Sequence, residues 1–258
     1  MRKIIKAKTT LIICTNGGSI EYNNKQEKEN DDSKELIKNF MLKYKCIVFD
    51  HDDTVVMSTA QIHYPSFQVT LAETRPEVDM SLEEFMMYCF DPGFYELCYD
   101  ILKFNEQEKK DQYERWMKHV ETNIPDFYPG VAKVINRQWE EGGIVCVVSH
   151  SNEINIRRDY RSAGVREPDM VFGWELGEGK RKPSPYPIER IMEEYDLKKS
   201  DILVVDDLKP GMVMAQNAGV EFACAGWSHI IPEIREYMMK NSANYFKSIE
   251  EMEHFCFE

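Results

Sequence analysis

The stretch KCIVFDHDDTVV, residues 45–56, decides the fold of this chain. Its first half is a short run of β-branched and aromatic residues, typical of a parallel strand buried on both faces. Asp50 and Asp52 follow this run directly. Ligands of open α/β sheets lie beyond the carboxyl ends of the strands, so these carboxylates fall where chemistry is expected and could share a divalent metal. On this segment alone, a solvated acidic turn is an equally good interpretation.

A second apolar run that ends in acids is ILVVDDLK, residues 202–209. Two strands that both end in carboxylates form a cluster that repels itself without a cation. Hard oxygen ligands suit Mg²⁺, which keeps several waters and favours phosphate oxygens. The pairs Asp50/Asp52 and Asp206/Asp207 therefore indicate a magnesium site, with two unrelated acidic turns as the alternative.

Two further segments indicate anion binding. The run GIVCVVSHSNE ends its apolar part at Ser149, and a hydroxyl beside the amides of a helix start suits a phosphate. The segment GKRKPSP supplies the basic residues 180–182, one of which could neutralise a phosphate and a nucleophile together. A basic triplet is ordinarily a solvated loop, so this segment carries little weight alone.

The rest of the chain alternates short β-rich runs with helical patterns, which predicts an α/β fold with a doubly wound parallel sheet. We expect strands at 46–49, 144–148, 170–172 and 202–205, and helices at 130–141, 153–163, 187–195 and 210–218. Residues 59–127 break the alternation with helix-length segments rich in Met, Phe and Tyr. They predict an inserted, all-helical domain.

Composition excludes several classes of protein. The 258 residues carry a formal net charge of −13, which argues against binding to nucleic acid or to an anionic membrane surface. The seven cysteines are dispersed and form no CxxC pair, which favours reduced thiols and a cytoplasmic protein. No apolar run is long enough to cross a bilayer. The composition does not indicate an oligomeric state.

We expect residues 1–40 to be a poorly ordered N-terminal extension, because residues 21–35 are polar and mixed in charge. A small docking arm is the alternative. The core domain would then comprise residues 41–58 and 128–258, and the helical insert residues 59–127.

Together, these motifs resemble those of the haloacid dehalogenase superfamily of aspartate-nucleophile phosphohydrolases. Asp50 to Thr54 match its DxDxT motif, Ser149 matches the second motif, Lys182 in KPSP the third, and Asp206-Asp207 the fourth. The resemblance covers residues 43–250 and implies a Rossmann-like core with a C1-type helical cap, as in phosphoglycolate phosphatases and β-phosphoglucomutases.

The resemblance also implies roles for these residues. Asp50 would be the nucleophile and Asp52 the general acid and base. Ser149, Lys182 and Thr54 would hold the phosphate or its loop. Mg²⁺ would be bound by Asp50, the backbone carbonyl of Asp52, Asp206 and Asp207, with Asp207 the safer choice of the last two.

The expected function is thus Mg²⁺-dependent hydrolysis of a small phosphorylated metabolite. A sugar-phosphate mutase and a catalytically idle binding protein are the alternatives. Two positions depart from the family pattern: Asp53 stands where glycine is frequent, and Gly211 where a further acid is frequent.

Overall fold

The computed structural model describes residues 3–7, 10–15, 18–23 and 42–258. It comprises two units, Met1–Lys43 and Tyr44–Glu258. In the first, β1 (Lys3–Ala7), β2 (Thr10–Thr15) and β3 (Gly18–Asn23) form an antiparallel sheet in the order β1-β2-β3. These strands lie within the predicted extension, and residues 24–41 lie outside the described residues. The nature of the extension therefore stays a prediction.

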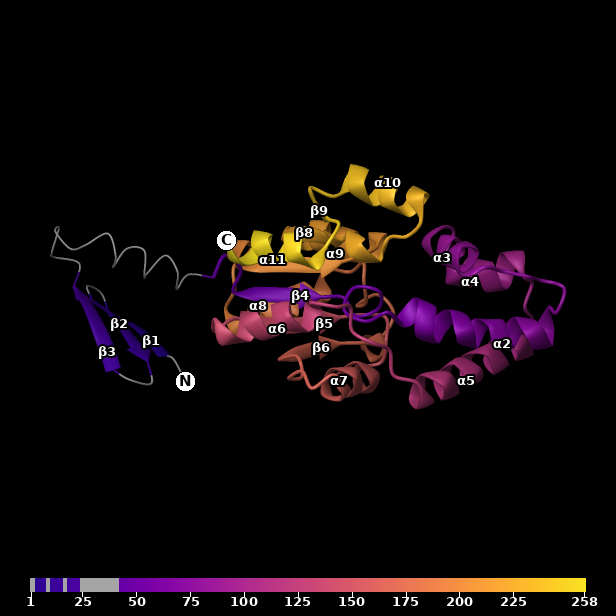
Figure 1. Ribbon diagram of the computed structural model, residues 1–258, viewed down its shortest axis with the longest axis horizontal. Coiled ribbons are helices and arrows are strands. Elements are labelled where there is room, and N and C mark those ends of the chain that lie inside the picture. The colour runs from indigo at the N-terminus through magenta and orange to yellow at the C-terminus, as the bar shows by residue number, and fades with distance from the viewer. Residues whose placement is uncertain (1–2, 8–9, 16–17, 24–41) are drawn as a thin grey trace. The chain divides into compact units, whose positions relative to one another are not determined.

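The second unit is built on a parallel sheet with strand order β6-β5-β4-β7-β8-β9 (Figure 1). The four predicted strands are present, each within one residue of its expected end: β4 (Cys46–Phe49), β5 (Ile144–Val148), β6 (Met170–Phe172) and β7 (Ile202–Asp206). Two more, β8 (Glu221–Ala225) and β9 (Asn244–Phe246), extend one edge and had no sequence prediction. The doubly wound α/β fold is confirmed.

Helices cover both faces of this sheet. Alternate residues of β4 point to opposite faces, so Ile47 and Phe49 enter one core cluster while Cys46 and Val48 enter the other. The first cluster includes side chains of α6 (Val131–Glu140), α7 (Glu153–Ser162) and α11 (Ile249–Phe257). The second includes side chains of α8 (Tyr186–Tyr195), α9 (Lys209–Ala218) and α10 (Pro232–Asn241). Short 3-10 turns occupy Trp174–Leu176, Lys199–Asp201 and Gly226–Ser228.

The insert between β4 and α6 is helical, as predicted, and we call it the cap (Figure 1). It consists of a π-helical turn (Thr59–His63), α2 (Tyr64–Thr74), α3 (Leu82–Phe90), α4 (Phe94–Glu96), a second π-helical turn (Leu97–Ile101) and α5 (Glu106–Thr122). Phe67, Phe85 and Leu97 belong to its own buried cluster. Capping boxes at Ser81 and Asn105 start α3 and α5 by satisfying free backbone N–H groups.

The two connections between cap and core run side by side. The backbone N–H of Met57 donates to the carbonyl of Asp126 at 2.9 Å, and Val56 forms an isolated antiparallel bridge with Phe127. These contacts between the two connections lie a few residues after Asp52, so they hold the start of the cap beside the end of β4. None of the described helices is long and apolar enough to cross a membrane.

Candidate active site

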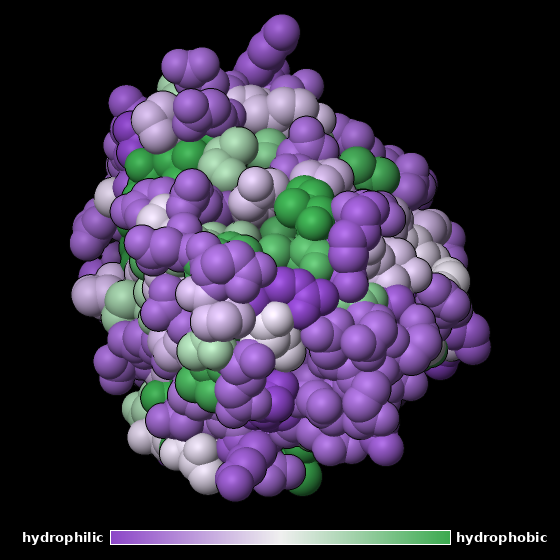
Figure 2. All heavy atoms as spheres, turned by 90° about the vertical axis from the view of Figure 1, so that its right-hand side faces the viewer, coloured by the Kyte–Doolittle hydropathy of each residue, from purple (hydrophilic) through white to green (hydrophobic). Residues whose placement is uncertain are grey.

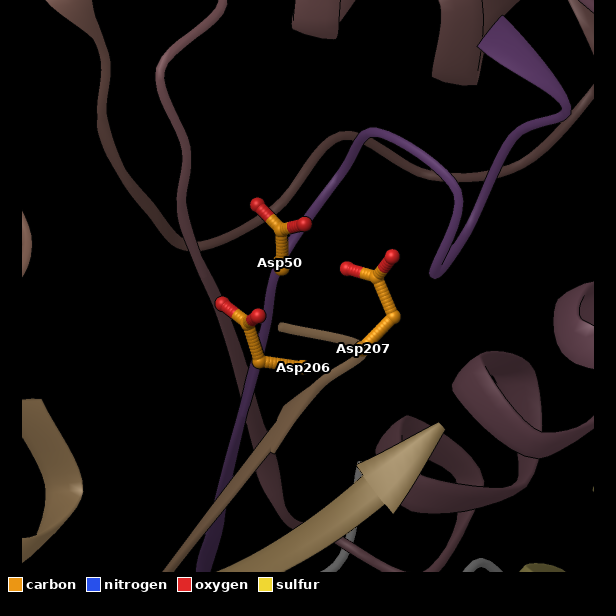
Figure 3. Close-up of side chains that lie close together, drawn as sticks. All are labelled: Asp50, Asp206 and Asp207. Atoms are coloured by element: carbon orange, nitrogen blue, oxygen red, sulfur yellow. The ribbon is translucent and has the colours of Figure 1, made fainter. Parts of the chain in front are cut away.

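Three buried carboxylates meet at the carboxyl ends of two neighbouring strands (Figure 3). The register of β4 and β7 pairs Phe49 with Val205, so Asp50 and Asp206 emerge at the same level. Asp207 follows at once. One carboxylate oxygen from each of the three residues lies within 4.8 Å of the other two, and each residue is at most 6% exposed. The sequence prediction that Asp50, Asp206 and Asp207 would lie together agrees with this geometry.

The Lys182 ammonium lies between two of these carboxylates. Its Nζ donates to Asp50 Oδ1 at 2.6 Å and to Asp206 Oδ2 at 2.7 Å. Desolvation opposes the charge of Lys182, but the two carboxylates raise its pKa above the ordinary value, so it stays protonated. Of the three basic residues in the 180–182 segment, Lys182 is thus the one that reaches the nucleophile position.

The charges of this cluster do not balance. With all three carboxylates ionised, the single ammonium of Lys182 leaves two negative charges without a counter-charge. Burial first, and then the neighbouring acids Asp206 and Asp50, raise the pKa of Asp207, so its charged form is disfavoured without a nearby cation. A hard divalent cation that prefers oxygen ligands fits these residues in both charge and donor type.

Asp206, at the end of β7, and Asp207, which follows it, differ in their hydrogen bonds. Asp206 uses both oxygens within the protein, since Oδ2 accepts from Lys182 and Oδ1 accepts from the backbone N–H of Leu208 at 2.9 Å. Asp207 has a weaker contact, with the Thr54 hydroxyl at 3.5 Å. Asp207 is therefore the more available oxygen donor for a metal. The family resemblance also favoured Asp207 over Asp206 as the metal ligand.

Asp52 has its own hydrogen-bond partners, outside the cluster of three carboxylates. Its Oδ2 accepts hydrogen bonds from the hydroxyls of Ser149 at 3.0 Å and Ser151 at 2.7 Å, and its Oδ1 faces His63 Nε2 at 3.2 Å. Burial opposes ionisation, but these contacts, His63 first among them, hold the pKa of Asp52 well below its usual range. In the free protein Asp52 is therefore a charged carboxylate that accepts hydrogen bonds, close to Asp50.

His63 is itself oriented by the cap. The indole N–H of Trp116, on α5, lies 3.0 Å from His63 Nδ1. Because an indole N–H can only donate, Nδ1 must accept, and the ring proton of neutral His63 lies on Nε2, toward Asp52. A hydrogen-bonded chain therefore runs from cap helix α5 through His63 to Asp52 in the core.

The structure accounts for both departures from the family pattern. Asp53 has a φ of 54°, in the left-handed region that glycine favours and aspartate tolerates. Its carboxylate accepts from the backbone N–H of Thr59 at 3.1 Å, which ties it to the first turn of the cap. At Gly211, a Cβ atom would lie 2.0 Å from Asp206 Oδ2. A side chain there would displace Asp206 from its bond to Lys182.

Two of the expected phosphate-binding residues have additional partners. Thr54 is fully buried, with its hydroxyl facing Asp207 and its carbonyl accepting from the Trp227 indole at 3.2 Å. Ser149 is 2% exposed and accepts from the backbone N–H of Ser151 at 3.0 Å in addition to its bond to Asp52. These contacts fix the loops around the carboxylates.

Sequence reasoning did not identify Ser151 or Trp116. The sequence does contain a signal for Ser151. This serine lies two residues after Ser149, as Asp52 lies two residues after Asp50, and each pair follows a buried strand. Trp116 had none, because it comes from a cap helix more than 50 positions away from its partner.

The family model for haloacid dehalogenase-like hydrolases matches residues 47–225. That range contains every strand-end residue described above.

Curated relatives and solved structures agree with this match. The PpaX protein of Caldanaerobacter subterraneus is 26% identical over 223 residues, covering 82% of this chain and 92% of its own. The pyrophosphatase PpaX of Bacillus cereus is 22% identical, covering 72% of this chain and 85% of its own. A hydrolase of the same family from Deinococcus radiodurans, solved with phosphate and sodium, superposes with a TM-score of 0.65 at 18% identity, covering 82% of this chain and 94% of that one.

Proposed function

The chain belongs to the haloacid dehalogenase-like hydrolase family, in its phosphatase branch, and on that premise we propose that it is a Mg²⁺-dependent phosphohydrolase of small phosphomonoesters. One observation carries the proposal: Asp50 lies in a buried, negatively charged cluster with Asp206, Asp207 and Lys182. Asp52 is close enough for its charge to act on Asp50. Such a cluster combines a nucleophile, a cation site and a phosphate-binding ammonium.

The first step is attack by a carboxylate oxygen of Asp50 on phosphorus. A phosphorus–oxygen bond to Asp50 forms while the bond to the leaving oxygen breaks, which gives an aspartyl-phosphate. Lys182 stabilises the charge on the phosphoryl oxygens, because its ammonium is fixed 2.6 Å from Asp50 before substrate arrives. Water then attacks the aspartyl-phosphate, releasing phosphate and restoring Asp50.

Asp52 supplies the proton to the leaving oxygen and takes one from the attacking water. In the free protein His63 and Ser151 hold its pKa low, so it must gain a proton when substrate binds. The negative charge of a bound phosphoryl group acts in that direction, because a like charge nearby raises the pKa of a carboxyl. His63 Nε2 and the two serine hydroxyls keep Asp52 aimed at one place throughout.

Asp50, Asp207 and Asp206 are the side chains that would hold Mg²⁺, together with the backbone carbonyl of Asp52. When bound, the ion neutralises charge on the phosphoryl group and on the crowded carboxylates. Asp206 also keeps Lys182 in position.

Hydrolysis of p-nitrophenyl phosphate, with Mg²⁺ and with EDTA, tests the proposal. We expect Mg²⁺-dependent turnover that Asp50→Asn lowers by about three orders of magnitude or more. Equal rates for the wild type and Asp50→Asn would refute it and favour an idle binding protein. Release of inorganic phosphate without an isomerised product, measured with a hexose phosphate, separates hydrolysis from mutase activity.

A further inference from the structure

A cavity of about 600 Å³ opens beside Asp52, between the cap and the core. Its size is that of a typical small-molecule site, which spans about 300–1,000 Å³. Asp52 lines it together with His63 and Ser151, so a leaving group protonated by Asp52 would lie inside it. We call this cavity the cap pocket.

The walls of the cap pocket are predominantly aromatic. Phe67 and Phe85 line it and are at most 2% exposed. Tyr95, Tyr113 and Trp174 also line it but are 61%, 48% and 46% exposed. One face of Tyr95 stacks on Tyr99, with ring centroids 3.8 Å apart, and the Arg181 guanidinium covers one face of Trp174, but much of each ring stays exposed. Large aromatic side chains that remain partly in water on a concave surface indicate a binding site.

These exposed rings come from both parts of the unit. Phe94 and Tyr95 lie on α4, Tyr113 on α5, and Trp174 on the 3-10 turn after β6 in the core. Figure 2 faces the end of the molecule where the cap helices lie, and hydrophobic side chains gather there among hydrophilic ones. A ring held in the cap pocket would thus contact both cap and core.

The pocket offers little to a second anion. Lys109 lines it, but its Nζ is paired with Glu106 at 2.7 Å and lies 3.1 Å from the centre of the Tyr99 ring. Among the described residues that line the pocket, no other lysine or arginine is present. Sugar bisphosphates, pyrophosphate and carboxylate-bearing esters each present an additional negative charge, for which the pocket lining itself offers only the paired Lys109. A further cation beside the lining is Arg181, whose guanidinium covers the Trp174 ring 3.4 Å from its centroid.

We propose that the cap pocket selects phosphomonoesters whose leaving group carries an uncharged aromatic ring. Aromatic rings pack edge-to-face and offset-stacked on one another, and a mixed Phe, Tyr and Trp wall accommodates both arrangements. This inference rests on the proposed phosphohydrolase function, because the pocket is placed by Asp52. It goes further by assigning the chemical class of the substrate.

Phenethyl phosphate and glycerol phosphate form a matched pair of substrates for the test. Both are phosphate esters of aliphatic alcohols, so a difference in rate reports on the pocket more than on leaving-group acidity. We expect kcat/KM for phenethyl phosphate to exceed that for glycerol phosphate and for pyrophosphate by at least about tenfold in the wild type with Mg²⁺.

Variants locate the preference in the pocket. Tyr113→Ser and Trp174→Ser are expected to lower the ratio of the two kcat/KM values severalfold. Met239→Ser is the matched control, because it removes an exposed apolar side chain from α10, outside the pocket, and is expected to leave the ratio unchanged. Circular dichroism checks that each variant is folded.

A binding experiment separates the two proposals. Phenethylphosphonate, which cannot be hydrolysed, is expected to change the fluorescence of Trp116 and Trp174 and to bind at least about tenfold tighter than hydroxypropylphosphonate. Tight, selective binding of phenethylphosphonate without hydrolysis of any ester would refute the phosphohydrolase function and support the aromatic preference. Hydrolysis of phenethyl phosphate and glycerol phosphate with equal kcat/KM, and equal binding of the two phosphonates, would refute the aromatic preference and support the phosphohydrolase function.

Discussion

Replacing Lys182 with methionine is expected to destabilise the metal-free protein by about 3–5 kcal/mol at pH 7, the usual cost of removing one partner from a buried ion pair. Methionine preserves most of the side-chain length but removes the ammonium. Asp50 and Asp206, 6% and 2% exposed, would then remain buried without the cation that both contact at 2.7 Å or less.

The assay is urea unfolding followed by circular dichroism in EDTA, supported by thermal unfolding. For a domain of this size each kcal/mol shifts the Tm by about 2–4 °C, so the variant should lose about 6–20 °C. Lys45→Met is the control. Its ammonium contacts Asp201 at 3.0 Å but is 59% exposed, and a surface pair of this kind contributes about 0–1 kcal/mol.

The pH dependence gives a second signature. Burial raises the pKa of Asp50, and the Lys182 ammonium opposes that rise in the wild type. A carboxyl whose folded pKa is raised destabilises the fold as the pH rises above its unfolded pKa, about 3.9. In the wild type the pKa of Asp50 is about 8, and without the lysine it is higher, so Asp50 is protonated at pH 7 in both proteins. The loss in Lys182→Met should therefore grow as the pH rises from 7 to 9. A loss below about 1 kcal/mol at both pH values, as for Lys45→Met, would refute this account of the charge cluster.

Three further predictions concern the same site. Mg²⁺ is expected to stabilise the wild type by about 2.7 kcal/mol at a hundredfold excess over its Kd, and Asp207→Asn should remove most of that gain; an equal gain in both, measured by thermal unfolding, would exclude Asp207 as a ligand. Gly211→Ala is expected to cost about 1–3 kcal/mol in urea unfolding and to lower phosphatase activity at least tenfold, because its Cβ would displace Asp206; a variant of wild-type stability and rate would contradict the close approach. Trp116→Phe is expected to raise the pKa of His63 in an NMR titration, because Nδ1 loses a donor and becomes free to take a proton; an unchanged or lower pKa would argue against the assigned tautomer.

The sequence contained the information for the central part of the fold. The strands that lead to Asp50, Ser149 and Asp206 are continuous apolar runs of mostly β-branched residues, and such runs are recognisable without any partner. The strand β9 (Asn244–Phe246) is a three-residue edge strand, and β8 (Glu221–Ala225) lies between it and β7. Neither is a run of β-branched residues, so their pairing depends on the finished sheet.

The same distinction applies to the site. The carboxylates at strand ends were predictable, because parallel strands bring their carboxyl ends together. The contacts that orient Asp52 were not, because Trp116 reaches His63 only after the cap helices have packed. The bond of His63 to Asp52 likewise depends on the two chain connections between cap and core lying side by side.

Trapping the phosphoenzyme tests the central claim most directly. Wild-type protein mixed with Mg²⁺ and a phosphomonoester is quenched in acid within one turnover and digested, and the peptides are measured by mass spectrometry. The account predicts that the peptide containing Asp50 carries one added phosphoryl group, and that Asp50→Asn carries none. Rapid phosphate release with no phosphoryl group on Asp50, or with full activity in Asp50→Asn, would contradict it.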